Sequence, residues 1–385
     1  MSPPGPVLSA DSHVIEPPDL WQARLGAAWD ERAPLVRRDD DGNDWWWVDA
    51  HRTNSFAGGT QTGRRFEGAE HLVLADRWEH VPAEVRDPHR YVEANRADGV
   101  VGSVLYPTQH LIHYKVRNQA LVTDCCRAYN DWLAEFCAAE PARLRGVAAL
   151  NVDDVGEAVA EAERAASLGL AAVLIPVSLP AGRSYADPAF EPLWSAVAGA
   201  GMPVCLHIAT DRADPRRNRA PLPPGFARDP GGPPILSSFA VADHWVRRSI
   251  ADLIFSGRLE RHPGLQVGSI EHEAGWAAYF VDRLDHTYTQ RATRGHRFAD
   301  GALPSDFFRR QVFLTFSEDA LAVRERATIG NLLFATDFPH SESTYPRTAA
   351  FVEAVTAGVG EAERHALLAA NTATRFGFAL HRTSD

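Results

Sequence analysis

Short apolar runs and longer amphipathic segments alternate along the chain from about residue 90 onward. The short runs, such as 100–106 and 171–176, are typical of buried strands. The longer segments, such as 118–137 and 155–168, carry apolar residues at helical spacing, which predicts helices with one buried face. The eight predicted strands lie near Ser9, Val104, Ala148, Val173, Val204, Val267, Leu314 and Phe334.

Eight strand–helix units in one chain of 385 residues predict an α/β fold, namely a TIM barrel. We expect a single domain spanning residues 1–385 with two irregular additions. The first is an insertion at about 32–70, rich in Gly, Asp and Trp, which we expect to form a small β-hairpin that covers part of the body. The second is a long loop after strand 5, at about 210–234, which is rich in Pro and Arg. This loop is predicted either as a lid that meets an anionic substrate or as a solvated loop or dimer arm.

The composition narrows the class of protein. The hydrophobic share of 45% and the charged share of 23% are ordinary for a globular protein in water. The formal charge of −11 argues against nucleic acid or an anionic membrane as the main partner. No apolar run approaches the roughly 20 residues that cross a bilayer, and no secretory signal opens the chain, so a cytoplasmic location is expected. The adjacent Cys125 and Cys126 lie in a helical segment and indicate core packing.

The first predicted strand ends in a pair of metal-ligand side chains. Its apolar residues lead into Asp11 and His13, and two prolines follow at Pro17 and Pro18. Residues two apart in a strand point to the same face. Asp11 and His13 therefore present a carboxylate and an imidazole side by side, which is half of a metal site.

Other predicted strands end in residues of the same chemical types. In a TIM barrel the chemistry lies where strands meet the loops that follow them. His207, Glu271 and Asp337 stand at such ends, and Asp337 could instead act as a general base. Each residue alone could have a structural role that involves no metal. Asp11, for example, could cap a turn, and His207 could be a core histidine. Their joint placement favours a partly open site for zinc, iron, manganese or cobalt.

Four segments, in this order, are similar to a known family. They are Asp11-Ser12-His13-x-x-Glu16-Pro17, Pro203-Val204-Cys205-Leu206-His207, Glu271-His272-Glu273-Ala274-Gly275-Trp276 and Ala335-Thr336-Asp337-Phe338-Pro339-His340. Together they resemble the amidohydrolase superfamily, and within it the amidohydrolase-2 family with its aminocarboxymuconate-semialdehyde and resorcylate decarboxylases. The resemblance covers nearly the whole chain. It implies a distorted TIM barrel, a divalent metal and a homodimer.

The family pattern can be carried over residue by residue. Asp11 and His13 fill the first-strand ligand pair, His207 fills the fifth-strand position and Asp337 the last-strand aspartate. Glu271 stands where many decarboxylases have a histidine. No lysine is present at 171–176 to bridge two metals, so a second ion would need carboxylate bridges. The predicted metal ligands are Asp11, His13, Glu16, His207, Glu271 and Asp337, and Glu273 is a further candidate for a bridge.

The resemblance implies a metal-dependent enzyme that decarboxylates or hydrolyses a small or cyclic carboxylate. One or two ions of zinc, manganese or iron would be the cofactor, and His272, Glu273 and His340 are the candidates for proton transfer. Because the site is rich in carboxylates, a dinuclear non-heme iron monooxygenase that hydroxylates a specialised metabolite is the alternative. A third, non-enzymatic interpretation is a barrel that retains the ligand residues without catalysing any reaction. The expected partner is a small-molecule substrate, and anions are among the candidates. Neither nucleic acid nor a membrane is expected as a partner.

Overall fold

The computed structural model describes residues 5–212, 240–291, 295–324 and 329–380. Its main sheet contains eight strands, each paired in parallel with the next. In spatial order they are β1 (Val7–His13), β5 (Val100–Tyr106), β6 (Leu144–Ala149), β7 (Ala172–Ser178), β8 (Val204–Asp211), β9 (Val267–Ile270), β10 (Val312–Phe316) and β11 (Leu332–Phe334). Backbone hydrogen bonds between the segment after β11 and β1, such as His13 N to Phe338 O at 2.7 Å, bring the last strand beside the first. The predicted TIM barrel is confirmed.

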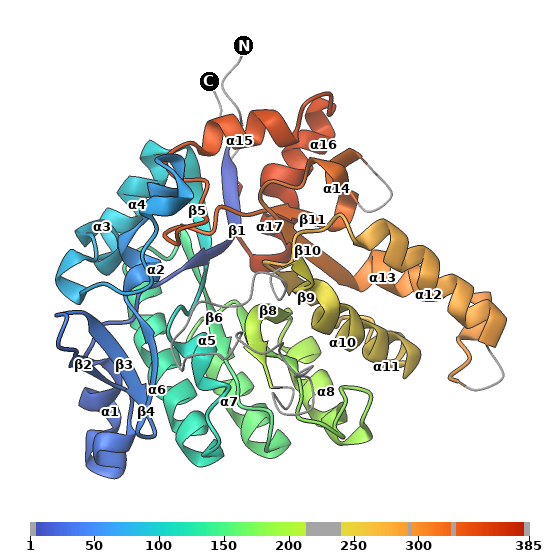
Figure 1. Cartoon of the computed structure of the whole chain (residues 1–385). Coiled ribbons are helices and arrows are strands. Elements are labelled where there is room, and N and C mark those ends of the chain that lie inside the picture. The colour runs from blue at the N-terminus through green and yellow to red at the C-terminus, as the bar shows by residue number, and fades with distance from the viewer. Residues whose placement is uncertain (1–4, 213–239, 292–294, 325–328, 381–385) are drawn as a thin grey trace, which may run out of the picture.

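Helices cover the outside of this ring (Figure 1). The longer ones are α1 (Leu20–Trp29), α4 (Pro88–Ala97), α6 (Gln119–Ala138), α7 (Val155–Ser167), α8 (Glu191–Gly199), α10 (Asp243–Phe255), α12 (Ala277–Arg291), α13 (Pro304–Gln311) and α15 (Thr348–Val355). The short ones are α2 (Ala57–Thr60), α3 (Ala83–Arg86), α5 (His110–His113), α11 (Arg258–Arg261), α14 (Ala320–Arg324), α16 (Glu361–His365) and α17 (Asn371–Phe376). Within the described ranges, no helix is both long enough and apolar enough to span a membrane.

The sequence sets where several of these helices begin. Asp87, Asn118 and Asp154 precede α4, α6 and α7, and the side chain of each accepts a backbone N–H of the first turn. Pro88 occupies the first position of α4, where its ring holds φ close to the helical value. All four cysteines are buried and unpaired, as the core-packing interpretation of Cys125 and Cys126 predicted.

The insertion forms a three-stranded antiparallel sheet instead of the predicted hairpin. Its strands are β2 (Leu35–Arg38), β3 (Asp44–Val48) and β4 (His51–Ser55). Because side chains alternate along β3, Trp46 is fully buried against Trp21 and Phe56, whereas its two tryptophan neighbours lie half-buried on the other face. Trp46 therefore packs the insertion on the barrel.

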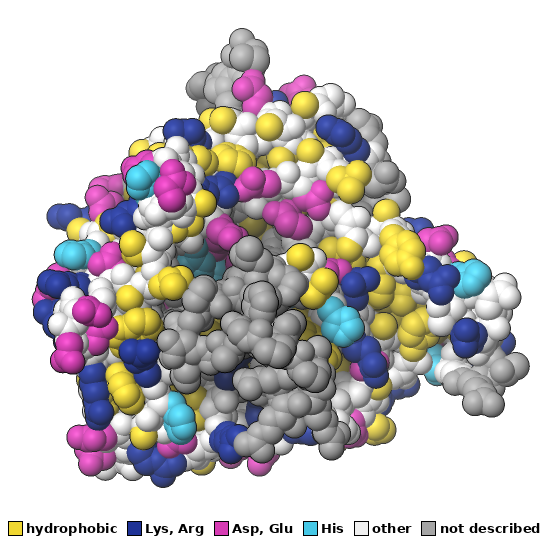
Figure 2. All heavy atoms as spheres, viewed as in Figure 1, with side chains coloured by type: hydrophobic (Ala, Val, Ile, Leu, Met, Phe, Trp, Pro, Cys, Tyr) yellow, Lys and Arg dark blue, Asp and Glu magenta, His cyan; other side chains and the backbone are white. Residues whose placement is uncertain are grey.

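The predicted loop at about 210–234 falls mostly outside the described residues, which stop at Arg212 and resume at 240. Arg212, just past β8, donates a hydrogen bond to Asp153, and Asp153 also pairs with Arg183 at 3.3 Å. Acidic and basic side chains are interspersed on the described part of the face in Figure 2, so it presents a mixed charge pattern.

Candidate metal centre

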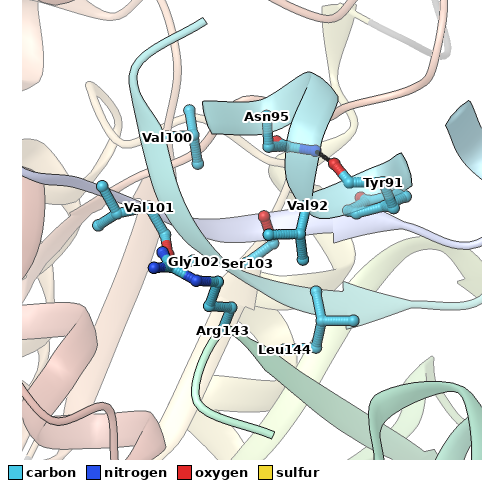
Figure 3. A pocket seen from close by; sticks show the side chains of 9 residues that line it. All are labelled: Tyr91, Val92, Asn95, Val100, Val101, Gly102, Ser103, Arg143 and Leu144. Atoms are coloured by element: carbon cyan, nitrogen blue, oxygen red, sulfur yellow. Dashed lines mark hydrogen bonds between the residues drawn. The ribbon is translucent and has the colours of Figure 1, made fainter. Parts of the chain in front are cut away.

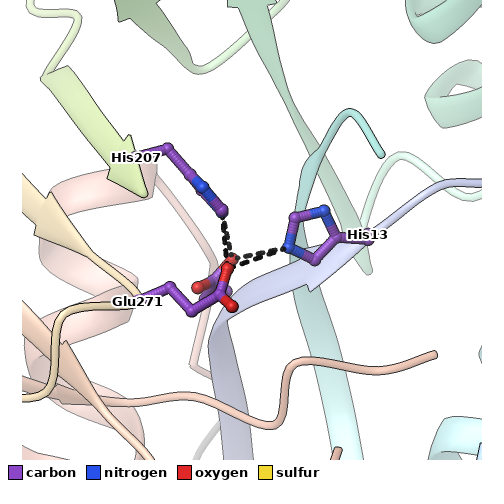
Figure 4. A group of neighbouring side chains, drawn as sticks. His13, His207 and Glu271 are labelled. Atoms are coloured by element: carbon purple, nitrogen blue, oxygen red, sulfur yellow. Dashed lines mark ion pairs between the residues drawn. The ribbon is translucent and has the colours of Figure 1, made fainter. Parts of the chain in front are cut away.

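The ends of four strands bring five of the predicted ligands together at one rim of the barrel. His13, on β1, and His207, on β8, both point toward Glu271, which follows β9 (Figure 4). The Nε2 atom of His207 lies 3.3 Å from Oε2 of Glu271 and 3.6 Å from Oδ1 of Asp11. The Nε2 atom of His13 lies 3.5 Å from Oδ1 of Asp11 and 3.4 Å from Oδ1 of Asp337.

The atoms form two overlapping groups, each with ligand atoms within 4.8 Å of one another. One contains Asp11, His13, His207 and Glu271, and the other contains His13, Glu271, Asp337 and His340. His13 and Glu271 belong to both. Within each group the ligand atoms are therefore close enough to share one ion.

Backbone carbonyls fix the orientation of both histidine rings. His13 Nδ1 lies 2.8 Å from the carbonyl oxygen of Pro107, and His207 Nδ1 lies 2.9 Å from that of Ile208. A carbonyl oxygen can only accept, so Nδ1 is the donor in each ring. Each Nε2 therefore faces the centre, the arrangement in which second partners orient histidine ligands to metals.

The donor atoms fit a divalent cation. Oδ1 of Asp11 and Nε2 of His13 and of His207 are buried and have no hydrogen-bond partner among the described residues. A buried polar atom without a partner carries a free-energy cost of about 1–3 kcal/mol, more for a charged group. One cation would satisfy all three atoms. Mixed imidazole and carboxylate donors suit zinc, manganese and iron.

The pKa shifts of the same side chains also favour a bound cation. Burial raises the pKa of the Asp11 carboxyl, and burial together with the Asp337 carboxylate raises that of Glu271 well above its usual value. Burial opposes protonation of His207, but the Asp11 carboxylate outweighs it and raises the pKa of His207 to about 9. These shifts favour the protonated forms of the groups when no cation is bound. A divalent ion would stabilise their ionised forms.

Left-handed backbone helps to aim the carboxylates. Glu271 and Asp337 have φ of 60° and 54°, values that residues with a side chain seldom adopt. Glu271 N donates to Thr315 Oγ1 at 2.8 Å, and Asp337 N donates to Asp11 O at 2.9 Å. Both bonds hold the turns that begin where β9 and β11 end.

Glu16 lies outside these groups, although the sequence predicts it as a ligand. Its carboxylate accepts backbone N–H groups of Thr108, Gln109 and His110 at 3.0–3.3 Å. The chain has left β1 before residue 16. The side chain therefore serves the segment after β5 instead of the metal centre.

The three candidates for proton transfer differ in how their polar atoms are engaged. The Glu273 carboxylate accepts Ser317 Oγ–H at 2.7 Å and belongs to neither group. His340 has a protein partner at each ring nitrogen, Asp337 and Thr108. His272 is buried, with Nδ1 3.2 Å from Ser269 Oγ and Nε2 without a partner among the described residues. Burial lowers the pKa of His272 to about 3, so its ring is neutral at physiological pH.

A shallow depression elsewhere contains none of these groups. It lies along the first half of β5 and the start of β6, away from the strand ends that carry the ligands (Figure 3). It is lined by Tyr91, Val92, Asn95, Val100, Val101, Gly102, Ser103, Arg143 and Leu144. We assign no chemistry to it.

Thr108 is a site residue that sequence reasoning missed. Its Oγ1 lies 2.8 Å from Nε2 of His340, which stacks on His13 with ring centroids 3.9 Å apart. A signal was present, because Thr108 stands two residues after the predicted strand 100–106, close to a strand end like Asp11 and His207. A lone hydroxyl at a strand end is too common to be recognised from one sequence.

A family model described as Amidohydrolase matches residues 48–378. The chain belongs to the amidohydrolase family. The predicted membership of the amidohydrolase-2 family is thereby confirmed.

Curated members of this family with similar sequences are gamma-resorcylate decarboxylases. The enzyme of Rhodococcus jostii (strain RHA1) is 28% identical over 278 residues, which are 66% of this chain and 76% of that enzyme. The enzyme of Polaromonas sp. (strain JS666 / ATCC BAA-500) is 28% identical over 240 residues, 58% of this chain and 68% of its own length.

Solved structures of amidohydrolases share the fold. An amidohydrolase from Mycobacterium avium subsp. paratuberculosis K-10 has a TM-score of 0.76 at 20% identity, covering 97% of this chain and 99% of that one. The 5-carboxyvanillate decarboxylase of Sphingomonas paucimobilis has a TM-score of 0.63 at 20% identity, with coverage of 97% and 99%. A dihydroxybenzoic acid decarboxylase from Polaromonas sp. JS666, with bound manganese and an inhibitor, has a TM-score of 0.60 at 18% identity, with coverage of 97% of each chain. None of these relatives and structures is described as an oxygenase.

Proposed function

We propose that this amidohydrolase is a metal-dependent decarboxylase that removes CO₂ from a small aromatic or cyclic carboxylate. The observation that carries the proposal is the convergence of unpaired ligand atoms of Asp11, His13 and His207 with the carboxylates of Glu271 and Asp337. The decarboxylases among the relatives support the choice of reaction. The proposed ligands are Asp11, His13, His207, Glu271 and Asp337.

The charge of the site explains why an anionic substrate requires a cation there. Asp11, Glu271 and Asp337 place three carboxyl groups within one small volume. A substrate carboxylate would be repelled by their ionised forms. A bound divalent cation, for which we propose manganese or zinc, would supply the positive charge that attracts and polarises a substrate oxygen.

Decarboxylation replaces a carboxylate with a hydrogen on the same carbon atom. The electrons of the broken C–C bond stay with that carbon, and one proton must reach it as CO₂ leaves. We assign this step to His272, whose ring is neutral at rest and would take up a proton from solvent before delivering it to that carbon, because its Nε2 is the ring nitrogen of the candidates that lacks a protein partner in the described structure. Glu273 and His340 are held by Ser317, Asp337 and Thr108.

A substrate panel tests the proposed reaction. Gamma-resorcylate, 5-carboxyvanillate and related hydroxybenzoates would be incubated with the manganese-loaded and the zinc-loaded protein while released CO₂ is measured. Turnover that depends on the metal and is lost in His272→Asn supports the proposal. Hydrolysis of the matching amides or lactones without CO₂ release would instead make the protein a hydrolase, and oxygen-dependent turnover with two bound irons would favour the monooxygenase. The homodimer and the cytoplasmic location stay predictions.

A further inference from the structure

His340 is held at both ring nitrogens by other side chains. Nδ1 lies 2.9 Å from Oδ1 of Asp337, and Nε2 lies 2.8 Å from Oγ1 of Thr108. An ionised carboxylate carries no proton, so this close contact is favourable only with a proton on Nδ1. In the neutral ring, Nε2 then accepts the hydroxyl proton of Thr108. Neither nitrogen is free to face a substrate.

One face of the His340 ring is also covered. This face stacks on His13, with centroids 3.9 Å apart and an angle of 29° between the planes. The insertion approaches the same ring through Gly58, where an added β-carbon would lie 3.7 Å from Cδ2 of His340 and 3.7 Å from Cγ2 of Thr108. Thr62, four residues further on, donates its hydroxyl proton to the carbonyl oxygen of Pro339. The insertion therefore passes close to this ring and is bonded to the residue before it.

Thr108 is in turn fixed by a buried carboxylate. Glu16 accepts the backbone N–H groups of Thr108 and its two successors, and it is fully buried. These bonds determine the path of the chain just after β5. The hydroxyl of Thr108 is thereby placed opposite Nε2 of His340.

We propose that Thr108 is a positioning residue of the metal centre. Through its hydroxyl it sets the ring of His340, and this ring orients the Asp337 carboxylate by a 2.9 Å ion-pair contact and the His13 imidazole by stacking. The inference rests on the proposed metal centre and extends it. On this proposal His340 is no longer a candidate for direct proton transfer. Glu16 then positions the backbone of Thr108 instead of binding the ion.

The test compares cobalt binding by Thr108→Val and Thr108→Ser with that of the wild-type protein. Valine keeps the shape of threonine without its hydroxyl, and serine keeps the hydroxyl. Cobalt(II) alone is the probe, because its visible absorption reports the geometry of its ligands without any substrate. Thr374→Val is the matched control, since the hydroxyl of Thr374 bonds only within its own exposed helical turn, to Ala370 O.

We expect Thr108→Val to weaken cobalt binding by about tenfold and to change the visible spectrum, as loss of an orienting partner does at other metal sites. Thr108→Ser and Thr374→Val should resemble the wild type, and the unfolding temperature of metal-free Thr108→Val should stay near that of the wild type. Wild-type affinity and spectrum in Thr108→Val would overturn the inference while leaving the metal centre intact. An equal defect in Thr108→Ser would also overturn it. Wild-type protein that binds no cobalt would overturn the metal centre and this inference together.

Discussion

The backbone amide of Asp337 donates a hydrogen bond of 2.9 Å to the carbonyl oxygen of Asp11. The two residues belong to opposite ends of the chain, and their carboxylates lie in the two overlapping groups of possible ligand atoms, which share His13 and Glu271. The bond that helps to bring the last strand beside the first therefore also helps to set the spacing of two proposed ligands.

His207→Ala should lose the metal while the fold survives. The imidazole contributes one proposed ligand atom, whereas β8 is held by its backbone pairing with β7 and β9. Elemental analysis should show far less metal than in the wild type, and the far-UV circular dichroism should be unchanged. His272→Ala is the control and should keep its metal. A full complement of metal in His207→Ala would count against the ligand assignment.

Glu271→Gln and Glu16→Gln should have opposite effects. Loss of the charge at Glu271 should weaken metal binding, because its carboxylate lies 3.3 Å from Nε2 of His207. Glu16→Gln should keep one ion per chain when metal is supplied in excess. It should lower the free energy of unfolding by about 1–3 kcal/mol, since an amide replaces the carboxylate that accepts three backbone N–H groups. Metal content and urea unfolding measure the two effects, and loss of metal only in Glu16→Gln would reverse our assignment.

Metal affinity should rise with pH. Burial raises the pKa of the Asp11 and Glu271 carboxyls, and the Asp11 carboxylate, against the effect of burial, raises that of His207 to about 9. Protons on these groups compete with the ion, so its affinity should fall on acidification and increase as pH approaches about 9. Titration with manganese at several pH values measures the trend. Affinity that is independent of pH would contradict this account.

Removal of the ion should lower the unfolding temperature. A ligand that binds only the folded state stabilises it by about 2.7 kcal/mol at one hundred times its dissociation constant. Without the ion, the carboxyl groups of Asp11, Glu271 and Asp337 remain close together. Calorimetry before and after chelation should show the loss, and added manganese should reverse it. An unchanged unfolding temperature would indicate that the ion does not bind where we place it.

His272→Asn should retain the metal but lose turnover. Proton transfer by a positioned side chain contributes about 10²–10⁴-fold to the rate, so kcat should fall within that range while metal content stays at the wild-type level. His340→Asn is the comparison and should affect metal affinity more than His272→Asn does. Wild-type kcat in His272→Asn would exclude it as the proton-transfer group.

The pattern of apolar runs was sufficient to predict the fold. Buried parallel strands are almost continuously apolar, and all eight appear where they were predicted, with ends that differ by a few residues. Asp11, His13, His207 and Asp337 could be found because each stands at or just after the end of such a run. In a TIM barrel the carboxyl ends of the strands lie at one rim, so these residues could be placed together from the sequence without any distance.

Contacts made by the loops could not be predicted in the same way. Glu16 stands close to Asp11 and His13 in sequence, but Pro17 and Pro18 follow it and its carboxylate turns to the amides after β5. The role of Thr108 depends on a ring that is more than two hundred residues away, in a different loop. The third strand of the insertion is short and polar, which is why it carries no apolar signal.

The most direct test of the metal centre is elemental analysis of the freshly purified protein under anaerobic conditions, beside His207→Ala prepared in the same way. We predict about one manganese or zinc ion per wild-type chain and little metal in the variant. Wild-type protein without any divalent ion after loading, or equal metal in both proteins, would contradict the central claim.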